Sequence, residues 1–487
     1  MRRAQMRFSD GRRGALAAAL VALVTSGCAD ATRLDRRVSL PDPPKQTESV
    51  GSAQREHQRI LAAYGGGYHD TKLESLMAKT VDRLVAASER PDLHYKVTIL
   101  NSPAVNAFAL PTGQLYVTRG MLALANDTSE LASVLAHEMA HVIAHHAAIR
   151  EEQVRQAALV NHVASDVFND PQMSAMALAK NKIMLASFSR GQELEADGIG
   201  VGISSRAGFD PFGAVRFLTA MGRNAELKFT PHNADPHHLD FLSSHPATPD
   251  RVKIAQANAR QYAAPGAERD KASYLGSLDG LVYGEDPSEG FVRGQRFLHP
   301  RLGFTFTAPK GFSLDNTSQA VLGVKDNGND ALRLDVVRVP GEQSLSEYIT
   351  SGWIENIVPS SVEELNINGF PAGTAIAKGE QWSFRLYAVR FGSEVYRMIF
   401  ATKRNLADAD RGFRDSVETF RRVTLAEIET AKPLRVQIIT VKGGDTAEVL
   451  ASRMAKVDRP LERFLVLNNL QLGQVFKDGE QLKIVVE

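Results

Sequence analysis

One stretch of the chain places two histidines and a glutamate in a spacing that suits a bound metal ion. His137 and His141 are four residues apart, so on a helix they point from the same face and can share one ion. Glu138 follows the first histidine and can reach a water molecule on that ion without being a ligand itself. Residues 129–141 contain no proline or glycine, which favours a helix. The pattern predicts a helical metal site that activates water for hydrolysis.

A further metal ligand has to come from another part of the chain. The metzincin class requires glycine at position 144 and histidine at position 147, and this chain has Ala144 and Ala147, which excludes that class. Further along, Glu193 and Asp197 are again four residues apart, so one can bind the ion while the other contacts a ligand histidine. Spacing alone does not decide which carboxylate is the ligand. Glu195 lies on another face of that helix, where we expect it to be in solvent.

The cysteine count restricts the donors of the metal site. Cys28 is the sole cysteine of the 487 residues, so neither an intramolecular disulfide nor a cysteine-based zinc site can form. Histidines and carboxylates must therefore hold the metal.

Short strands precede the histidine-bearing helix. Apolar residues alternate in 96–100 and 115–118, and a turn is predicted at 111–113. An edge strand in this region can pair with an extended polypeptide and read its backbone rather than its sequence. The residues that we assign to substrate binding are Asn106, Ala107 and Phe108.

Four sequence blocks, in this order, resemble the HtpX-like and BepA-like gluzincin metallopeptidases, which are relatives of the CAAX prenyl proteases. The resemblance covers roughly residues 55 to 260. The blocks are Asn106–Pro111 with Gly113 and Val117, the run from His137 to His146, the segment Glu193–Asp197, and Ser244-His245-Pro246 with Arg251.

This resemblance implies a mainly helical peptidase domain with a small sheet and one zinc ion per chain. His137, His141 and Glu193 are then the zinc ligands, and Glu138 is the general base. Two imidazoles and one carboxylate leave the fourth tetrahedral position to water, as a catalytic zinc requires. The residues expected to support the ligands are Asp197, Arg251 and His146.

His245 is assigned to the catalytic site through the same resemblance. Its segment is expected to fold back over the zinc, where the imidazole either stabilises the oxyanion or occupies the fourth metal position and keeps the enzyme idle. The nearby histidines fit a lid or a plain surface loop; they are His232, His237 and His238.

The N-terminus predicts export. In residues 1–28 a basic start precedes the apolar stretch 14–24, as in a signal peptide, and the end, Thr25-Ser26-Gly27-Cys28, resembles the bacterial lipobox. We therefore expect lipidation of Cys28 and a tether at 29–52, with cleavage elsewhere by an ordinary signal peptidase as the alternative. Ala29, rather than an aspartate, follows the cysteine, which favours the outer membrane.

The remaining chain predicts further parts beyond a peptidase domain at 53–265. A linker is expected at 266–290 and an α+β accessory domain at 291–425. Residues 434–487 resemble a LysM module, a small βααβ fold that in its family binds N-acetylglucosamine glycans such as peptidoglycan. Gly443 replaces a frequent proline of that module, and a purely structural role is the alternative.

Composition agrees with an α+β multidomain globular protein. The chain has 57 Lys and Arg against 56 Asp and Glu, a net charge of +1, and this balance does not indicate nucleic acid as a partner. The combined prediction is a lipid-anchored zinc endopeptidase of the periplasm that degrades misfolded envelope proteins. The alternatives are a non-proteolytic chaperone or glycan-bound scaffold whose zinc site is closed by His245, and a processing enzyme with one dedicated substrate.

Overall fold

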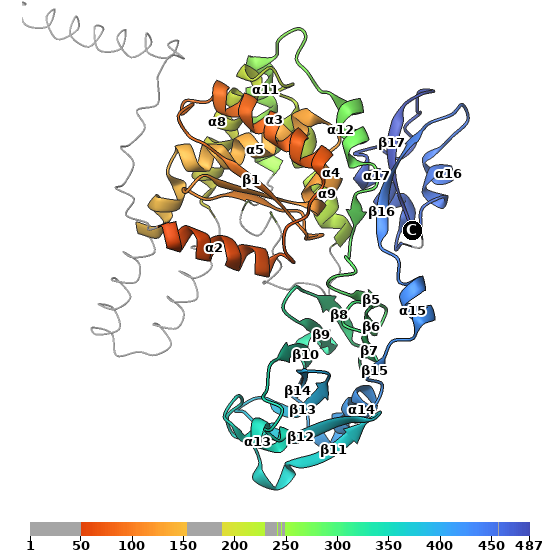
Figure 1. The fold of residues 1–487 in the computed structure, drawn as a ribbon. Coiled ribbons are helices and arrows are strands. Elements are labelled where there is room, and N and C mark those ends of the chain that lie inside the picture. Colours follow the sequence, from red (N-terminus) through yellow and green to blue (C-terminus); the bar gives the residue numbers. More distant parts are fainter. Residues whose placement is uncertain (1–49, 153–187, 229–240, 242–244, 246–248, 456) are drawn as a thin grey trace, which may run out of the picture. The chain divides into compact units, whose positions relative to one another are not determined.

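The computed structural model describes residues 50–152, 188–228, 241, 245, 249–455 and 457–487. These residues form helices and several sheets in a mixed α/β, multidomain arrangement (Figure 1), which confirms the predicted fold class at that level. The predictions for Cys28, His232, His237 and His238 fall outside the described residues.

Helices surround a three-stranded sheet in the part that precedes residue 263. The sheet has the order β1–β3–β2, with β1 parallel and β2 antiparallel to β3, so β2 lies at one edge. The strands are β1 (Lys96–Leu100), β2 (Ala107–Ala109) and β3 (Gln114–Thr118). The helices are α2 (Val50–Ala63), α3 (Thr71–Ala87), α4 (Arg119–Leu124), α5 (Thr128–Ile143), α8 (Arg190–Arg206), α9 (Gly213–Lys228) and α11 (Pro249–Tyr262).

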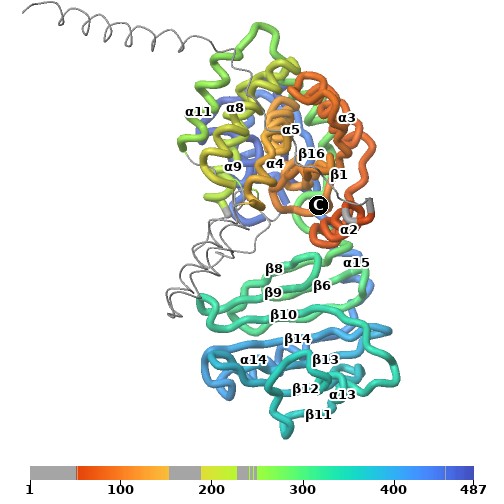
Figure 2. Tube along the Cα trace, turned by 90° about the vertical axis from the view of Figure 1, so that its left-hand side faces the viewer, coloured from red at the N-terminus to blue at the C-terminus, as the bar shows by residue number. Residues whose placement is uncertain are grey.

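The helix α5 carries the paired histidines through the interior. Every one of its residues except Val142 is buried, as expected for a helix that is apolar on most sides. Asp127 caps its first turn by accepting a hydrogen bond from the Glu130 N–H. Figure 2 shows α3, α8 and α9 around α5, and all three pack against it.

A glycine lets α8 approach α5 at the first histidine. A Cβ atom at Gly200 would lie 3.0 Å from the backbone nitrogen of His137, closer than nine in ten real contacts of that kind. The absence of a side chain at this position therefore permits the short distance between α8 and α5 that brings Glu193 and Asp197 beside His137.

The accessory domain consists of two antiparallel sheets and short helices. Its buried core is rich in phenylalanine and includes Phe304, Phe400 and Phe420. One sheet has the order β15–β7–β6–β5, with strands Arg421–Arg422, Phe304–Thr307, Arg296–His299 and Phe291–Arg293. The other has the order β11–β12–β13–β14–β10–β9–β8, with strands Glu363–Ile367, Phe370–Lys378, Ser383–Phe391, Glu394–Thr402, Asp330–Val337, Val321–Lys325 and Ser313–Asn316. The helices are α13 (Leu345–Thr350), α14 (Leu406–Val417) and α15 (Leu425–Thr430).

The C-terminal segment has the strand–helix–helix–strand order that the sequence predicts, although its kinship with LysM remains a prediction. Its elements are β16 (Leu434–Thr440), α16 (Ala447–Ser452), α17 (Pro460–Leu467) and β17 (Gln481–Val486). A third strand comes from the segment predicted as a linker, where the structure has α12 (Lys271–Leu278) and β4 (Val282–Tyr283). β4 pairs with β16, and the buried Tyr274, Leu275 and Leu278 give α12 an apolar face that glycine content alone does not reveal.

One lysine joins the C-terminal segment to the helical part that precedes residue 263. Lys483 is fully buried, and its Nζ donates hydrogen bonds of 2.7 Å to the carbonyls of Ala123 and Ala125 at the end of α4. Asn468 fixes the lysine backbone from both sides, through its amide nitrogen and its amide oxygen. Because a buried ammonium requires acceptors, this contact attaches the C-terminal segment to the helical part.

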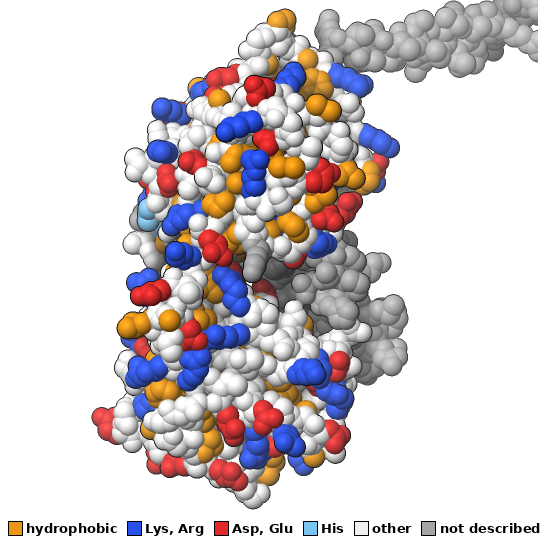
Figure 3. Space-filling view, turned by 90° about the vertical axis from the view of Figure 1, so that its right-hand side faces the viewer, with side chains coloured by type: hydrophobic (Ala, Val, Ile, Leu, Met, Phe, Trp, Pro, Cys, Tyr) orange, Lys and Arg blue, Asp and Glu red, His pale blue; other side chains and the backbone are white. Residues whose placement is uncertain are grey.

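Basic and acidic side chains are interspersed on the face shown in Figure 3, in agreement with the net charge of +1. No helix in the described ranges has the length and apolar character needed to cross a membrane.

Candidate metal centre

Four buried side chains from three separate segments converge at the C-terminal half of α5. Their donor atoms all lie within 4.8 Å of one another, and the side chains are His137, His141, Glu193 and His245. The Nε2 atoms of His137 and His141 are 3.0 Å apart, and His245 Nδ1 is 3.4 Å from the former. When four ligand atoms surround a zinc ion tetrahedrally at metal–ligand distances of about 2.0–2.2 Å, the ligand atoms are about 3.3–3.5 Å from one another. The donor separations of this site therefore fit a zinc ion.

Burial keeps the imidazoles in the form that binds metal. Desolvation lowers the pKa of His137 and His141 and lowers that of His245 to about 3, so the rings are neutral at neutral pH. A metal ligand must be deprotonated, and these rings meet that requirement without a metal. Burial also raises the pKa of Glu193, because it disfavours the charged carboxylate, and a bound cation would stabilise that charge.

A carboxylate and an arginine orient the first histidine. His137 Nδ1 lies 2.9 Å from an oxygen of Asp197, which leaves Nε2 directed at the metal position. Arg251 donates from Nε and Nη2 to both Asp197 oxygens at 2.7 and 2.8 Å. Although burial opposes it, the hydrogen bonds from Arg251 and His137 lower the pKa of Asp197 to about 2. Arg251 Nη1 is also 2.7 Å from Glu193, so it supports two carboxylates at once.

The second histidine has a parallel arrangement. His145, immediately after the end of α5, adopts a left-handed backbone with φ of 55°, which residues other than glycine rarely take. This turn directs the next side chain back, so that His146 Nδ1 lies 2.9 Å from His141 Nδ1. His146 Nε2 in turn is 3.4 Å from a carboxylate oxygen of Glu195. Glu195 is exposed, as predicted, and the structure adds this contact with His146, which comes from a segment 49 residues away.

Glu138 has the position and the burial of a general base. It is 2% exposed, and one oxygen is 3.7 Å from His245 Nε2. Burial and the nearby Glu193 charge raise its pKa well above the usual range, while a hydrogen bond from the Ala109 backbone N–H opposes this rise. The edge strand β2 thus touches the carboxylate directly.

The residues predicted for substrate binding lie in and just before this edge strand. Asn106 donates from Nδ2 to the Tyr64 hydroxyl at 3.0 Å, and its backbone bonds to Thr118, so it anchors the strand. Phe108 stacks on Tyr116 with ring centroids 4.9 Å apart. The backbone N–H and C=O groups of successive strand residues point to opposite sides of the strand. Those of Ala107 therefore point away from β3, and so does the Ala109 N–H, which bonds to Glu138.

Sequence reasoning missed the aromatic residues at the site. Phe241 stacks on His245 with ring centroids 4.3 Å apart, and its N–H donates to the Val105 carbonyl at 2.8 Å. Phe188 packs on His141 at 4.2 Å. Phe188 ends an apolar run at helical spacing, which the sequence offers as core or as a surface near the cleft, whereas no spacing signal points to Phe241.

Comparison with known proteins agrees with this geometry. Residues 72–259 match the family model "Peptidase family M48". This segment belongs to peptidase family M48. It contains both histidines of α5, Glu193 and His245, so the M48 assignment and the convergent donor set concern the same residues.

Curated relatives of the M48 segment are metalloendopeptidases and proteases by name. The chain is 31% identical over 210 residues to the mitochondrial metalloendopeptidase OMA1 of Schizosaccharomyces pombe, covering 41% of this chain and 58% of that protein. It is 29% identical over 261 residues to the beta-barrel assembly-enhancing protease of Escherichia coli, covering 50% and 52%. The chain therefore spans about half the length of these relatives.

Similarity to solved structures is weaker. The cyanobacterial PsbP of Synechocystis matches 29% of the chain at 13% identity with a TM-score of 0.23, a value too low to establish a shared fold.

Proposed function

We propose that this chain is a zinc endopeptidase that hydrolyses unfolded or misassembled proteins of a bacterial envelope. The observation that carries the proposal is the convergence of His137, His141 and Glu193 on one point, with the buried carboxylate of Glu138 beside it. The M48 match and the relatives named as proteases support the reaction class.

The chain's own residues supply the proton transfers. His137, His141 and Glu193 would hold the zinc ion, which would supply an activated water molecule and polarise the scissile carbonyl. Glu138, with its raised pKa, accepts the proton of the attacking water and returns it to the leaving nitrogen. The substrate backbone lies along the outer edge of β2 at Ala107. On one side of this position the Val105 carbonyl already accepts a hydrogen bond from Phe241, and on the other side Ala109 contacts Glu138.

His245 gives this site a closed form. Its Nδ1 lies among the other three donors and 2.8 Å from Glu193. Four protein ligands are typical of a structural zinc, whereas a catalytic zinc keeps one position for water. The idle state expected from His245 therefore corresponds to this four-donor arrangement, and catalysis requires its ring to leave. This geometry also supports the second candidate, a non-proteolytic chaperone or scaffold.

Location and anchoring complete the proposal. A lipid on Cys28 would hold the protein at the periplasmic side of the outer membrane, and the C-terminal module would bind peptidoglycan. The resemblance of residues 25–28 to a lipobox and of residues 434–487 to LysM supports these assignments. The similarity to the beta-barrel assembly-enhancing protease agrees with an envelope substrate.

The test combines zinc content with cleavage of denatured casein, using residues 29–487 and the Glu138→Gln variant. Both proteins should bind about one zinc, and only the wild type should cleave. If neither cleaves, activity gained by His245→Ala identifies a latent protease, and continued inactivity favours the non-proteolytic alternative. Cleavage of a single envelope protein but not of casein would favour a dedicated processing enzyme.

A further inference from the structure

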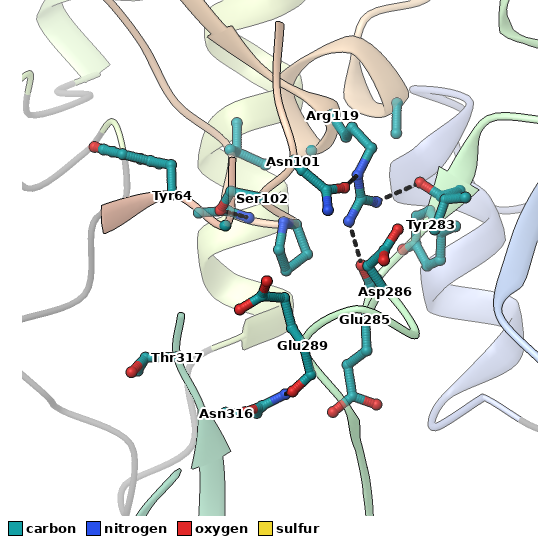
Figure 4. Close-up of a pocket in the computed structure, with 18 of the residues that line it drawn as sticks. Tyr64, Asn101, Ser102, Arg119, Tyr283, Glu285, Asp286, Glu289, Asn316 and Thr317 are labelled. Carbon is teal, nitrogen blue, oxygen red and sulfur yellow. Dashed lines mark hydrogen bonds between the residues drawn. The ribbon is translucent and has the colours of Figure 1, made fainter. Parts of the chain in front are cut away.

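A cavity lined partly by residues of the M48 segment contains none of the four metal-site donors in its lining. Its volume is about 390 Å³, within the range of binding sites for small ligands or a few side chains. Its lining comes from residues 63–65, residues 101–105, α4, the second half of α9, the turn 282–289, residues 315–318 with Leu322, and α17. Figure 4 shows these segments meeting around one open space.

The cations of the lining are already engaged. Arg119 is 1% exposed and donates to the Asn101 side chain at 2.7 Å and to the Val282 carbonyl at 2.6 Å. Arg463 lies 3.4 Å from the Tyr283 hydroxyl and is paired with Asp458. Both guanidinium groups are therefore held by the protein, and neither makes the cavity an anion site.

The carboxylates of the lining give the cavity its charge. Glu285 is paired with Arg293 at 2.8 Å and its carboxylate points out of the space, whereas Figure 4 shows Glu289 projecting into the space near Ser102. Burial and the charge of Asp286 raise the pKa of Glu289. A cation placed in the cavity would offset both effects. The acidic residues of the lining are Glu285, Asp286, Glu289 and Asp315.

The rest of the wall is largely apolar. Ala63, Pro103, Val105 and Leu227 contribute to it. An occupant with an aliphatic body and a cationic end matches this wall, and the side chains of lysine and arginine have that form. A free anion or a purely apolar ligand matches it less well.

The cavity is continuous along the chain with the edge strand at the metal centre. Ala104 and Val105 line it, and Ala109, five residues beyond Ala104, contacts Glu138. Residues 104–106 lie outside β2, and the Phe241 N–H occupies the Val105 carbonyl, so the cavity is a neighbour of the edge strand and not an extension of its open edge.

We propose that this cavity binds a lysine or arginine side chain of an unfolded polypeptide. That the polypeptide is a substrate rests on the proposed function, whereas binding of the basic segment does not. The site would select unfolded segments that combine apolar and basic residues.

The first test measures binding without cleavage. Two fluorescein-labelled unstructured peptides, identical except for one lysine replaced by norleucine, are titrated with zinc-loaded Glu138→Gln protein. We expect the lysine peptide to bind about five- to tenfold tighter, and Glu289→Gln to remove that preference. Glu342→Gln, at an exposed position outside the cavity, is the matched control. Glu289→Lys places an ammonium in the cavity and should weaken the lysine peptide further.

Equal affinity for the two peptides, or a preference that survives both substitutions of Glu289 in folded protein, would overturn the proposal. Thermal unfolding of each variant checks the fold. Binding that depends on Glu289 in a protein that never cleaves would refute the peptidase function and leave the basic-segment site intact. Where the wild type cleaves, Glu289→Gln should lower the rate of cleavage of the lysine peptide relative to the norleucine peptide.

Discussion

Replacing His146 should weaken zinc binding although the residue is not a ligand. His146 Nδ1 lies 2.9 Å from His141 Nδ1 and its Nε2 lies 3.4 Å from Glu195, and these two contacts orient the His141 ring with Nε2 toward the other metal-site donors. Loss of such a partner typically costs about 10- to 100-fold in metal affinity. Because His146 is 1% exposed, water cannot readily replace its ring. We therefore expect His146→Ala to lower zinc affinity by an amount in the upper part of this range, about 30- to 100-fold or roughly 2–3 kcal/mol.

The assay is competition for zinc against a chelator of known affinity, monitored with the apo protein so that no turnover is needed. Glu195→Gln is the graded control: its amide oxygen can still accept from His146, and the wild-type contact is long at 3.4 Å, so the loss should stay below about tenfold. A cobalt-substituted His146→Ala protein should also show a shifted visible spectrum, since the His141 ring is less constrained. Unchanged zinc affinity and an unchanged cobalt spectrum would refute the idea that His146 orients the His141 ring.

Three further outcomes follow from particular contacts. Lys483→Met leaves the carbonyls at the end of α4 without their donor, and should lower the free energy of unfolding by about 2–3 kcal/mol in urea titrations; no change would mean that the module is not held there. Gly200→Ala pushes α8 away from the His137 backbone, so zinc affinity should fall about tenfold by the same chelator assay, whereas Gly222→Ala, with open space around it, should be neutral. Burial lowers the pKa of His299 to about 4 from 6.5, so the unfolded chain binds the extra proton between these values and stability should fall as pH drops from 6.5 to 4, by up to about 3 kcal/mol. His299→Gln should flatten that part of a thermal unfolding series, and an unaltered pH dependence would contradict the burial argument.

Local spacing was sufficient for the helices of the metal centre. Residues four apart share a helix face whatever the rest of the fold, so His137 with His141, and Glu193 with Asp197, could be placed from the sequence alone. The choice of Glu193 over Asp197 as ligand came from family resemblance, and the geometry accords with it: Asp197 faces the outer nitrogen of His137. The role of Glu193 as a zinc ligand stays a prediction until metal is measured.

Contacts between distant segments could not be predicted in the same way. Phe241 reaches Val105 across the fold, and Glu195 meets His146 only because His145 turns the chain back. The strand β4 escaped notice because two residues paired at a sheet edge have no periodicity of their own. Such features depend on tertiary packing, and the spacing of residues along a single sequence does not reveal which distant segments pack together.

The pairing of β4 with β16 shows where the chain between them could be removed from the protein. Tyr283 lies opposite Leu434 in an antiparallel ladder, although about 150 residues separate them in the chain. The accessory domain therefore occupies the position of a hairpin loop, with both ends of the insert leaving from one point. A protein in which residues 284–433 are exchanged for a two-residue turn should keep the M48 domain joined to its C-terminal module. That shortened chain would lack the part of the cavity lined by residues 284–289 and 315–322 but keep the metal centre, so it would separate the proposed bond cleavage from the proposed choice of substrate.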